Sequence, residues 1–144
     1  CRVLAEAAKL VGVKRVMTVY GLDGLDEISV SAPTRMVFID ENGKVEDRRI
    51  TFEDFGRGGI RPDTGELAGG SAEENAAEAV LLMEGGGNPV IREAVLVNTA
   101  AALFVRGAAG DLRGGYEMAR ALFDTGKVLG KYREIESYSP GDRA

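Results

Sequence analysis

The stretch "VMTVYGLDGLDEIS", residues 16–29, changes from an apolar run to an acidic loop. Its first half is rich in β-branched residues and predicts a buried strand. Its second half brings Asp23, Asp26 and Glu27 together behind glycines. Carboxylates repel one another, so this clustering raises the free energy unless a cation or hydrogen-bond donors compensate for it. The stretch therefore predicts either a metal site or a solvated loop at the end of a strand.

Two features of the loop favour a divalent cation. Gly21 and Gly24 permit the backbone turns that the neighbouring side chains of Asp26 and Glu27 need in order to face one ligand. Hard oxygen ligands on a flexible loop suit Mg²⁺, which keeps most of its waters and takes one or two carboxylates together with substrate phosphates. Spacing alone leaves both the magnesium site and the solvated loop open.

Composition limits the other classes of function. The 144 residues suffice for one domain with its own core, and no apolar run reaches the roughly 18 residues of a membrane helix. The net charge of −5 argues against broad binding to nucleic acid or anionic membranes. The chain has no histidine, so any catalysis must use carboxylates, lysine, backbone donors or a hard cation. The single cysteine, Cys1, cannot form an internal disulfide, and a cytoplasmic location is the simplest interpretation.

Hydrophobic periodicity and turn signals predict the other elements. Asn42-Gly43 lies between two apolar runs and predicts an antiparallel hairpin over residues 30–51. Helices are predicted at 2–11, 71–84, 89–106 and 111–135, with one short helical turn at 51–56. Ser71 and Glu74 form a capping box, and Asp111 caps the last helix. The resulting order is a helix, a strand, the acidic loop, a hairpin, a glycine-rich loop and three helices.

Two further stretches carry polar groups that need an explanation. Asn98 lies in an otherwise apolar helix, where an unpartnered amide costs about 1–3 kcal/mol. We expect it to tie its helix to the end of another element or to the acidic loop, and a direct ligand role is the alternative. The small residues 99–102 would let a neighbouring backbone approach closely. The stretch "GRGGIR", residues 56–61, could hold an anion, although a surface loop is the simpler interpretation.

Several motifs together resemble one known family. The motifs "VYGLDGLDEIS", "EDFG", "GGSAEENA", "VLVNTAAALFVRG" and "GYEMARALFDTGKVLGKY" have the order and rough spacing seen in anthranilate phosphoribosyltransferases, from about residue 2 to residue 133. Nucleoside phosphorylases share the general architecture but match these motifs less well. The resemblance implies an α/β fold in which the four predicted helices flank a mixed central sheet, as in the C-terminal domain of that family.

The resemblance also implies an activity. The family transfers the 5-phosphoribosyl group of phosphoribosyl pyrophosphate to anthranilate, with release of pyrophosphate, in tryptophan biosynthesis. Its Asp-Glu pair coordinates Mg²⁺ at the pyrophosphate, and the matching residues here are Asp26 and Glu27. No catalytic side chain and no other cofactor-binding residue are assigned. The alternative is a non-catalytic relative that keeps the scaffold and binds nucleic acid or another anionic ligand.

The chain departs from the family pattern in two ways. Tyr20 stands where the family commonly has histidine. The family's Gly-Thr-Gly-Gly-Asp phosphate loop, its anthranilate-binding residues and its N-terminal helical domain have no counterpart within residues 1–144. We therefore expect one α/β domain segment from the C-terminal part of a longer enzyme, which forms a homodimer through the missing helical region. On its own this segment is expected to be inactive.

Overall fold

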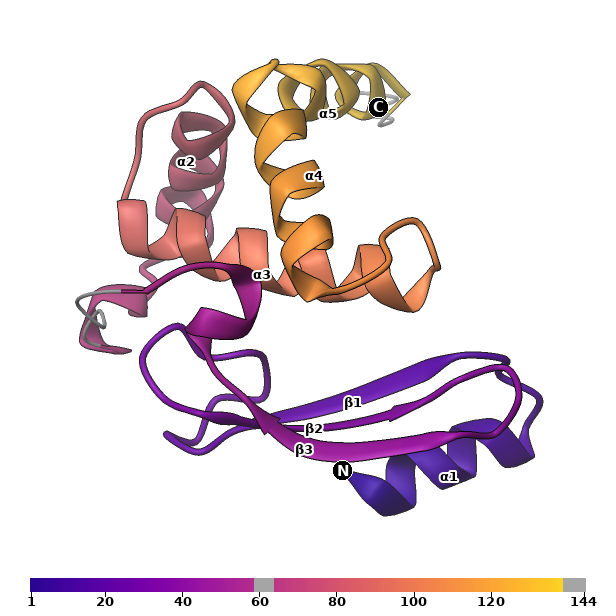
Figure 1. Ribbon diagram of the computed structural model, residues 1–144. Coiled ribbons are helices and arrows are strands. Elements are labelled where there is room, and N and C mark those ends of the chain that lie inside the picture. Colours follow the sequence, from indigo (N-terminus) through magenta and orange to yellow (C-terminus); the bar gives the residue numbers. More distant parts are fainter. Residues whose placement is uncertain (59–63, 139–144) are drawn as a thin grey trace.

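The computed structural model describes residues 1–58 and 64–138 of the chain. Its elements follow the predicted alternation of helices and strands (Figure 1). In chain order they are α1 (Arg2–Leu10), β1 (Val16–Gly21), β2 (Thr34–Ile39), β3 (Val45–Ile50), the 3-10 turns η1 (Phe52–Phe55) and η2 (Thr64–Leu67), α2 (Ala72–Met83), α3 (Pro89–Val105), α4 (Leu112–Asp124) and α5 (Lys127–Tyr138). Within the described part of the chain, no helix combines the length and apolar character needed to cross a membrane.

The three strands form one sheet in the order β1-β2-β3, and both neighbouring pairs are antiparallel. The predicted hairpin is confirmed, with Thr34 paired to Ile50 and Ile39 to Val45. Its turn is fixed by Asp40, whose side chain accepts the backbone N–H groups of Asn42 and Lys44. The parallel part of the expected mixed sheet is absent from these described strands, because they are joined by a loop and a hairpin and not by a helical crossover.

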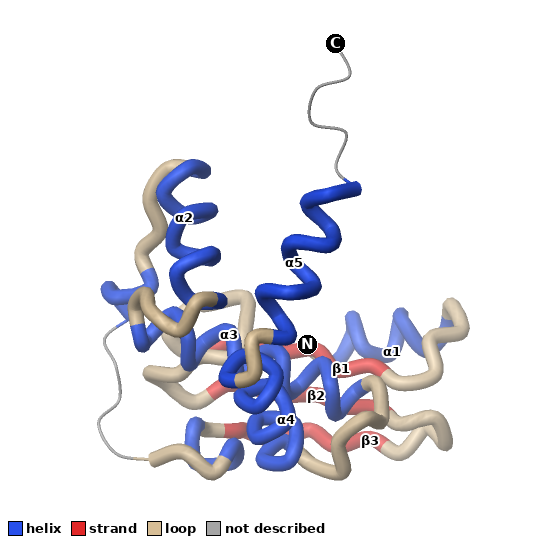
Figure 2. Tube along the Cα trace, turned by 90° about the horizontal axis from the view of Figure 1, so that it is seen from above, coloured by secondary structure: helices blue, strands red, loops and turns tan. Residues whose placement is uncertain are grey.

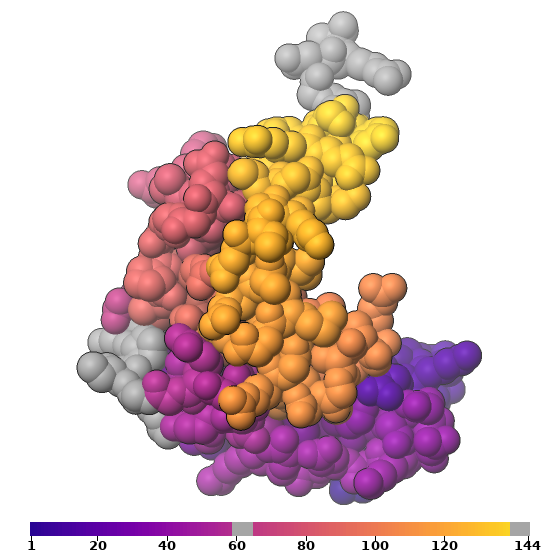
Figure 3. Space-filling model, turned by 45° about the horizontal axis from the view of Figure 1, so that its top comes forward, coloured from indigo at the N-terminus to yellow at the C-terminus, as the bar shows by residue number. Residues whose placement is uncertain are grey.

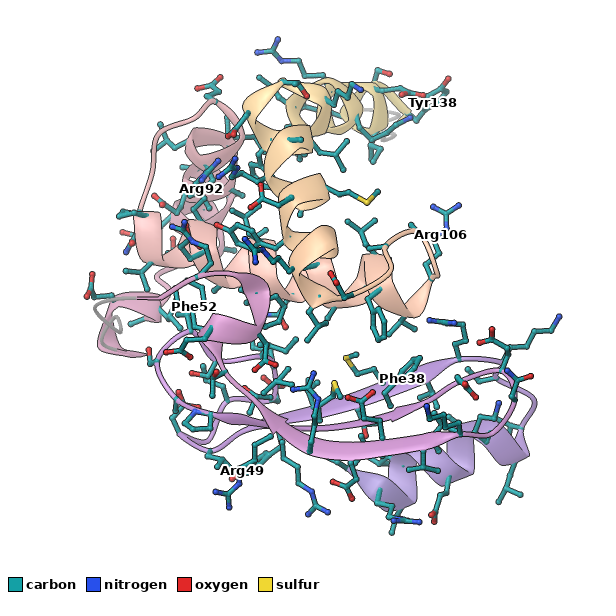
Figure 4. The ribbon with its side chains drawn as sticks, viewed as in Figure 1. Phe38, Arg49, Phe52, Arg92, Arg106 and Tyr138 are labelled. Carbon is teal, nitrogen blue, oxygen red and sulfur yellow. The ribbon has the colours of Figure 1, made fainter. Side chains whose placement is uncertain are left out.

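The sheet is covered on both faces by different helices (Figure 1). Val37 and Ile39 of β2 face α1, where they pack against Ala5. Met36 and Phe38 point the other way, into the main core with α3 and α4. Figure 4 shows Phe38 directed toward this helical layer and Arg49 of β3 directed away from it. The alternation explains why β2 is apolar almost throughout, since each face of the strand is buried.

Helix α3 is the buried helix that its sequence predicts. Its core residues are Val90, Ala94, Leu96, Val97, Ala100 and Ala101. Helix α4 crosses α3 so closely that a Cβ atom placed on Gly115 would lie 2.5 Å from the carbonyl oxygen of Ala100. The predicted close approach to the small residues 99–102 is therefore present. It is made by the backbone of α4.

Two helical predictions need correction. The helix expected at 111–135 is interrupted, because Thr125 leaves helical geometry and Gly126 adopts a left-handed φ of +70°. Helices α2 and α5 lie on the far side of α3 and α4 and so do not flank the sheet (Figures 1 and 2). Figure 3 shows α5 projecting from the helical layer, with a notch below it beside α4.

The first helix exposes most of its large apolar side chains. Val3, Leu4 and Val11 are 79%, 68% and 82% exposed, whereas Ala5 is fully buried against β2. Strand β1 is half-buried and not the buried strand expected, because Met17 and Val19 line an open hollow beside α3. Within the described sheet, only one of its edges is paired. Helix α1 packs against β1 and β2 and therefore lies on the β1 side of the sheet (Figure 2).

Candidate functional site

The acidic loop follows β1 as a tight turn. Gly21 donates its N–H to the carbonyl of Leu25 at 2.8 Å, and Gly24 donates to the carbonyl of Gly21 at 2.9 Å. Gly24 has a φ of +99°, a conformation that side chains disfavour. A Cβ atom on Gly21 would lie 2.6 Å from a carboxylate oxygen of Asp23. The chain therefore turns at both glycines, as the sequence predicts, and the left-handed φ makes glycine the favoured residue at position 24.

Asp23 is held within the loop itself. One of its oxygens accepts the Ser29 hydroxyl at 2.5 Å. The same hydroxyl oxygen accepts the N–H groups of Ser31 at 3.0 Å and Ala32 at 2.9 Å, and the Ser29 N–H donates to the Thr34 hydroxyl at 2.9 Å. Hydrogen-bond donors thus compensate the charge of this carboxylate. The clustering of acids did not reveal this role, although the serine six residues downstream was the available signal.

Asp26 and Glu27 are in a different environment. Both are exposed, and neither forms a hydrogen bond or an ion pair with any residue in the described ranges 1–58 and 64–138. Nor do the described residues contain a cluster of three or more acidic or cysteine side chains able to hold a metal. Among the described residues, the structure therefore separates the three acids into one carboxylate that is bonded within the loop and one adjacent, exposed pair without a hydrogen-bond partner.

Asn98 connects α3 to this loop. Its Oδ1 atom accepts the Ile28 N–H at 3.0 Å, and its Nδ2 atom donates to the Ile28 carbonyl at 3.2 Å and to the Ala94 carbonyl at 2.9 Å. The predicted link between the amide and the acidic loop is thus present. The link is made to the backbone of the residue that directly follows Glu27.

A shallow hollow adjoins Asn98. It has a volume of about 420 Å³ and lies between β1 and α3, where it is lined by Met17, Val19, Asn98, Ala101, Ala102, Val105 and Arg106. Asp26 and Glu27 are not among these residues. The hollow is mostly apolar, so its walls suit hydrophobic contact, and the carboxylates lie outside it.

The glycine-rich stretch after η1 was considered as an anion-binding loop, but its Arg57 is engaged by side chains of the fold. Arg57 pairs with Glu93 at 3.3 Å, and its guanidinium lies 5.5 Å from the centre of the Tyr116 ring. The Tyr116 hydroxyl donates to the other oxygen of Glu93 at 2.7 Å. Arg57 thus stabilises the junction of η1, α3 and α4. Residues 59–61 of the possible anion-binding stretch, including Arg61, fall outside the described residues.

Comparison with known proteins shows the family of the chain that carries this loop. The sequence profile of the "glycosyl transferase family, a/b domain" matches residues 1–129. The chain belongs to this glycosyl transferase family. The matched range contains the whole sheet, the acidic loop and Asn98. The candidate site is therefore built from the family's own domain.

Individual members of the family agree with the resemblance seen in the sequence. An anthranilate phosphoribosyltransferase from Thermomicrobium roseum is 40% identical over 136 residues, which cover 94% of this chain and 39% of that protein. The crystal structure of an anthranilate phosphoribosyltransferase from Thermus thermophilus superposes with a TM-score of 0.77 at 28% identity, over 94% of this chain and 37% of that one. The predicted resemblance and the α/β fold class are confirmed. The chain spans about two fifths of the length of the relatives it matches.

A second solved structure concerns the metal. The anthranilate phosphoribosyltransferase from Saccharomyces cerevisiae, in complex with phosphoribosyl pyrophosphate and Mg, has a TM-score of 0.69 and 25% identity over 85% of this chain and 34% of that one. That protein binds both the diphosphate substrate and magnesium.

Proposed function

We propose that this protein transfers the 5-phosphoribosyl group of phosphoribosyl pyrophosphate to anthranilate in tryptophan biosynthesis and releases pyrophosphate. The observation that carries the proposal is the exposed Asp26–Glu27 pair, which has no ion-pair partner within residues 1–58 and 64–138 and lies on a loop of the glycosyl transferase family's α/β domain. Relatives named anthranilate phosphoribosyltransferase, matched over 94% of this chain, support the substrate assignment. The proposal concerns the whole protein, because the chain spans only 39% of such a relative.

The residues present fit Mg²⁺ as the metal. Mg²⁺ is bound through one or two carboxylates with waters and substrate phosphates, and seldom by a cage made of protein alone. Asp26 and Glu27 supply two hard oxygen donors without a competing arginine or lysine in the described ranges. Asp23 is excluded from this set because its oxygens are engaged with Ser29 and the loop backbone. We therefore assign magnesium to Asp26 and Glu27.

The chemistry sets what these residues must do. Cleavage of the bond at the anomeric carbon leaves positive charge on the sugar and negative charge on the departing pyrophosphate. A magnesium ion supplies Lewis-acid stabilisation of such a leaving group. Asp26 and Glu27 would hold such an ion at the acidic loop, and neither residue lines the apolar hollow beside Asn98. A histidine base is not needed, because the aromatic amine attacks with a lone pair that it already carries.

The remaining parts of the proposal concern the whole protein. The phosphate loop, the anthranilate-binding residues and the dimer interface belong to regions that have no counterpart in residues 1–144. We propose that these regions complete the active site, that the protein is a homodimer through its helical region, and that it works in the cytoplasm. This segment contributes one metal-binding edge.

The test replaces both carboxylates in the protein expressed from its complete gene. Asp26→Asn with Glu27→Gln should abolish the magnesium dependence of turnover and lower kcat/KM by about 100-fold or more, the effect of removing preorganised charge at a leaving group. Phosphoribosyl transfer is measured against magnesium concentration. The control, Glu117→Gln with Glu134→Gln, removes the same charge from exposed positions on α4 and α5 and should leave turnover unchanged.

Two outcomes would contradict the assignment. Unchanged magnesium dependence in the double variant would remove the role of Asp26 and Glu27. Absence of transfer in the unaltered protein, together with binding to nucleic acid, would favour the non-catalytic relative considered from the sequence.

A further inference from the structure

The geometry points to Asn98 as a positioning residue that presents Asp26 and Glu27 to the metal. The inference rests on the proposed function and adds to it a residue that contacts neither metal nor substrate. Asn98 acts through the backbone of Ile28, which it holds on both sides by the N–H and the carbonyl. Ile28 directly follows Glu27 in the chain. The position of its backbone therefore restricts where the backbone of Asp26 and Glu27 lies.

Every hydrogen-bonding group of the amide is used. The oxygen of Asn98 takes one donor, and its NH₂ group serves the Ile28 carbonyl and the Ala94 carbonyl one turn earlier in α3. The bond to Ala94 fixes the side-chain rotamer and identifies which amide atom is nitrogen, since only NH₂ can donate. Asparagine therefore suits this position. Aspartate could not donate to the two carbonyls, and an apolar residue could neither accept the Ile28 N–H nor donate to the carbonyls.

The loop is anchored on both sides of the acidic pair. Before it, the carbonyl of Leu25 accepts the Gly21 N–H. After it, the Ile28 side chain is 2% exposed and belongs to the main core. Between these anchors only Asp26 and Glu27 reach solvent. Two adjacent carboxylates repel each other, so in a loop without anchors the two carboxylate groups would move apart. The amide clamp opposes this separation and adds no charge of its own.

A matched control exists in the same chain. Asn75 holds Gly70 in the same manner, because its oxygen accepts the Gly70 N–H at 2.9 Å and its nitrogen donates to the Gly70 carbonyl at 3.3 Å. This second clamp lies at the start of α2, and its hydrogen bonds among the described residues go to Gly70 and not to the acidic loop. Removing either amide deletes a similar set of bonds, but only Asn98 adjoins the proposed metal pair.

The experiment measures Mn²⁺ binding, by electron paramagnetic resonance, to the protein expressed from its complete gene. Asn98→Ala should weaken the Mn²⁺ affinity by about tenfold, the lower end of the range seen when a group that orients a metal ligand is removed. Asn75→Ala should leave the affinity within twofold of the unaltered protein. An equal affinity in the Asn98→Ala and unaltered proteins would overturn the inference.

A second measurement needs no variant. In the unaltered protein, the Ile28 amide should exchange its hydrogen slowly, because Asn98 accepts it, although the adjacent loop is exposed. Exchange as fast as that of a free loop amide would also overturn the inference. Failure of the proposed function would give a different result. In that case the double variant Asp26→Asn with Glu27→Gln would bind Mn²⁺ as tightly as the unaltered protein.

Discussion

Three carboxylates in one short loop have two different fates. Asp23 accepts the Ser29 hydroxyl and belongs to the framework of the loop, whereas Asp26 and Glu27 stay exposed. The sequence could place all three at a strand end, and the family resemblance singled out the last two. It could not show that Asp23 is engaged, because this depends on a serine brought back by the turn of the loop.

The first prediction concerns two serines of this loop. Ser29 is 1% exposed, and its hydroxyl donates to Asp23 and accepts two backbone N–H groups. Ser29→Ala should lower the free energy of unfolding by about 2–4 kcal/mol, because buried polar groups lose their partner. Chemical denaturation measures the change. A loss below about 0.5 kcal/mol would show that the network contributes little.

Ser31→Ala is the matched control. The Ser31 hydroxyl oxygen is buried and has no hydrogen-bond partner among the described residues. Its removal should leave stability unchanged or raise it by about 1 kcal/mol, since an unpaired buried hydroxyl is unfavourable. If both serine variants lose the same stability, the difference in bonding between the two hydroxyls has no energetic effect.

The second prediction concerns Tyr116. Burial, followed by the hydrogen bond to Glu93 and its negative charge, raises the pKa of Tyr116 to about 12, while the guanidinium groups of Arg57 and Arg92 act in the opposite direction. A folded-state pKa above the unfolded value of about 10 stabilises the protein at pH values below 10. This stabilisation is lost as the pH rises from about 10 to about 12.

Tyr116→Phe tests this pH dependence. The difference in unfolding free energy between the unaltered protein and the variant should be constant below pH 10 and should shrink toward pH 12, because only the unaltered protein has the hydroxyl to lose. Unfolding is followed at a series of pH values. In parallel, the variant should lack the last tyrosinate transition in an alkaline absorbance titration. A difference that does not change with pH would contradict the assignment.

At the scale of elements, local signals predicted the starts of helices better than their ends. Ser71 and Glu74 make the predicted capping box, and Asp111 accepts the Gly114 N–H at the start of α4. These bonds lie within one turn of helix, so the sequence contains both partners. The end of α4 at Thr125 and Gly126 was missed, because the amphipathic pattern continues into α5 while the backbone turns away.

The third prediction uses the two neighbouring glycines of α4. Gly115→Ala should destabilise the protein by about 2 kcal/mol, since steric conflict with the Ala100 backbone outweighs the better helix propensity of alanine. At Gly114 the nearest atom to an added Cβ is the Asp111 carboxylate at 3.2 Å, and Gly114→Ala should be neutral or stabilising by up to about 1 kcal/mol. Thermal unfolding distinguishes the two variants. Equal effects would show that α3 and α4 can move apart without cost.

At the scale of the whole molecule, the sequence predicted the fold class, which the comparison with solved structures confirms. It also predicted the order of elements, apart from the break that divides the last helix into α4 and α5. The sequence did not show which side of α1 is exposed, and it misplaced α2 and α5, which do not flank the sheet. Helical periodicity shows that a face is apolar but does not show what covers it. Val3, Leu4 and Val11 illustrate this, since the helix packs on the sheet through Ala5 instead.

The fourth prediction concerns the segment as a unit. Residues 1–144 contain the proposed metal pair but none of the family's phosphate-loop motif. The segment expressed alone should therefore show no phosphoribosyl transfer, while the product of the complete gene should be active. Pyrophosphate release from the two proteins at equal concentration measures this. Measurable turnover by the segment alone would contradict the proposal that regions outside residues 1–144 complete the active site.

The two borders of the sheet have opposite chemistry. The outer strand β3 exposes Glu46, Asp47, Arg48 and Arg49 in succession, and charged edges resist the addition of a further strand. The opposite border, β1, is short of charge, and only one of its edges is paired among the described strands. A further strand would therefore add more readily beside β1, on the side of the sheet where α1 lies.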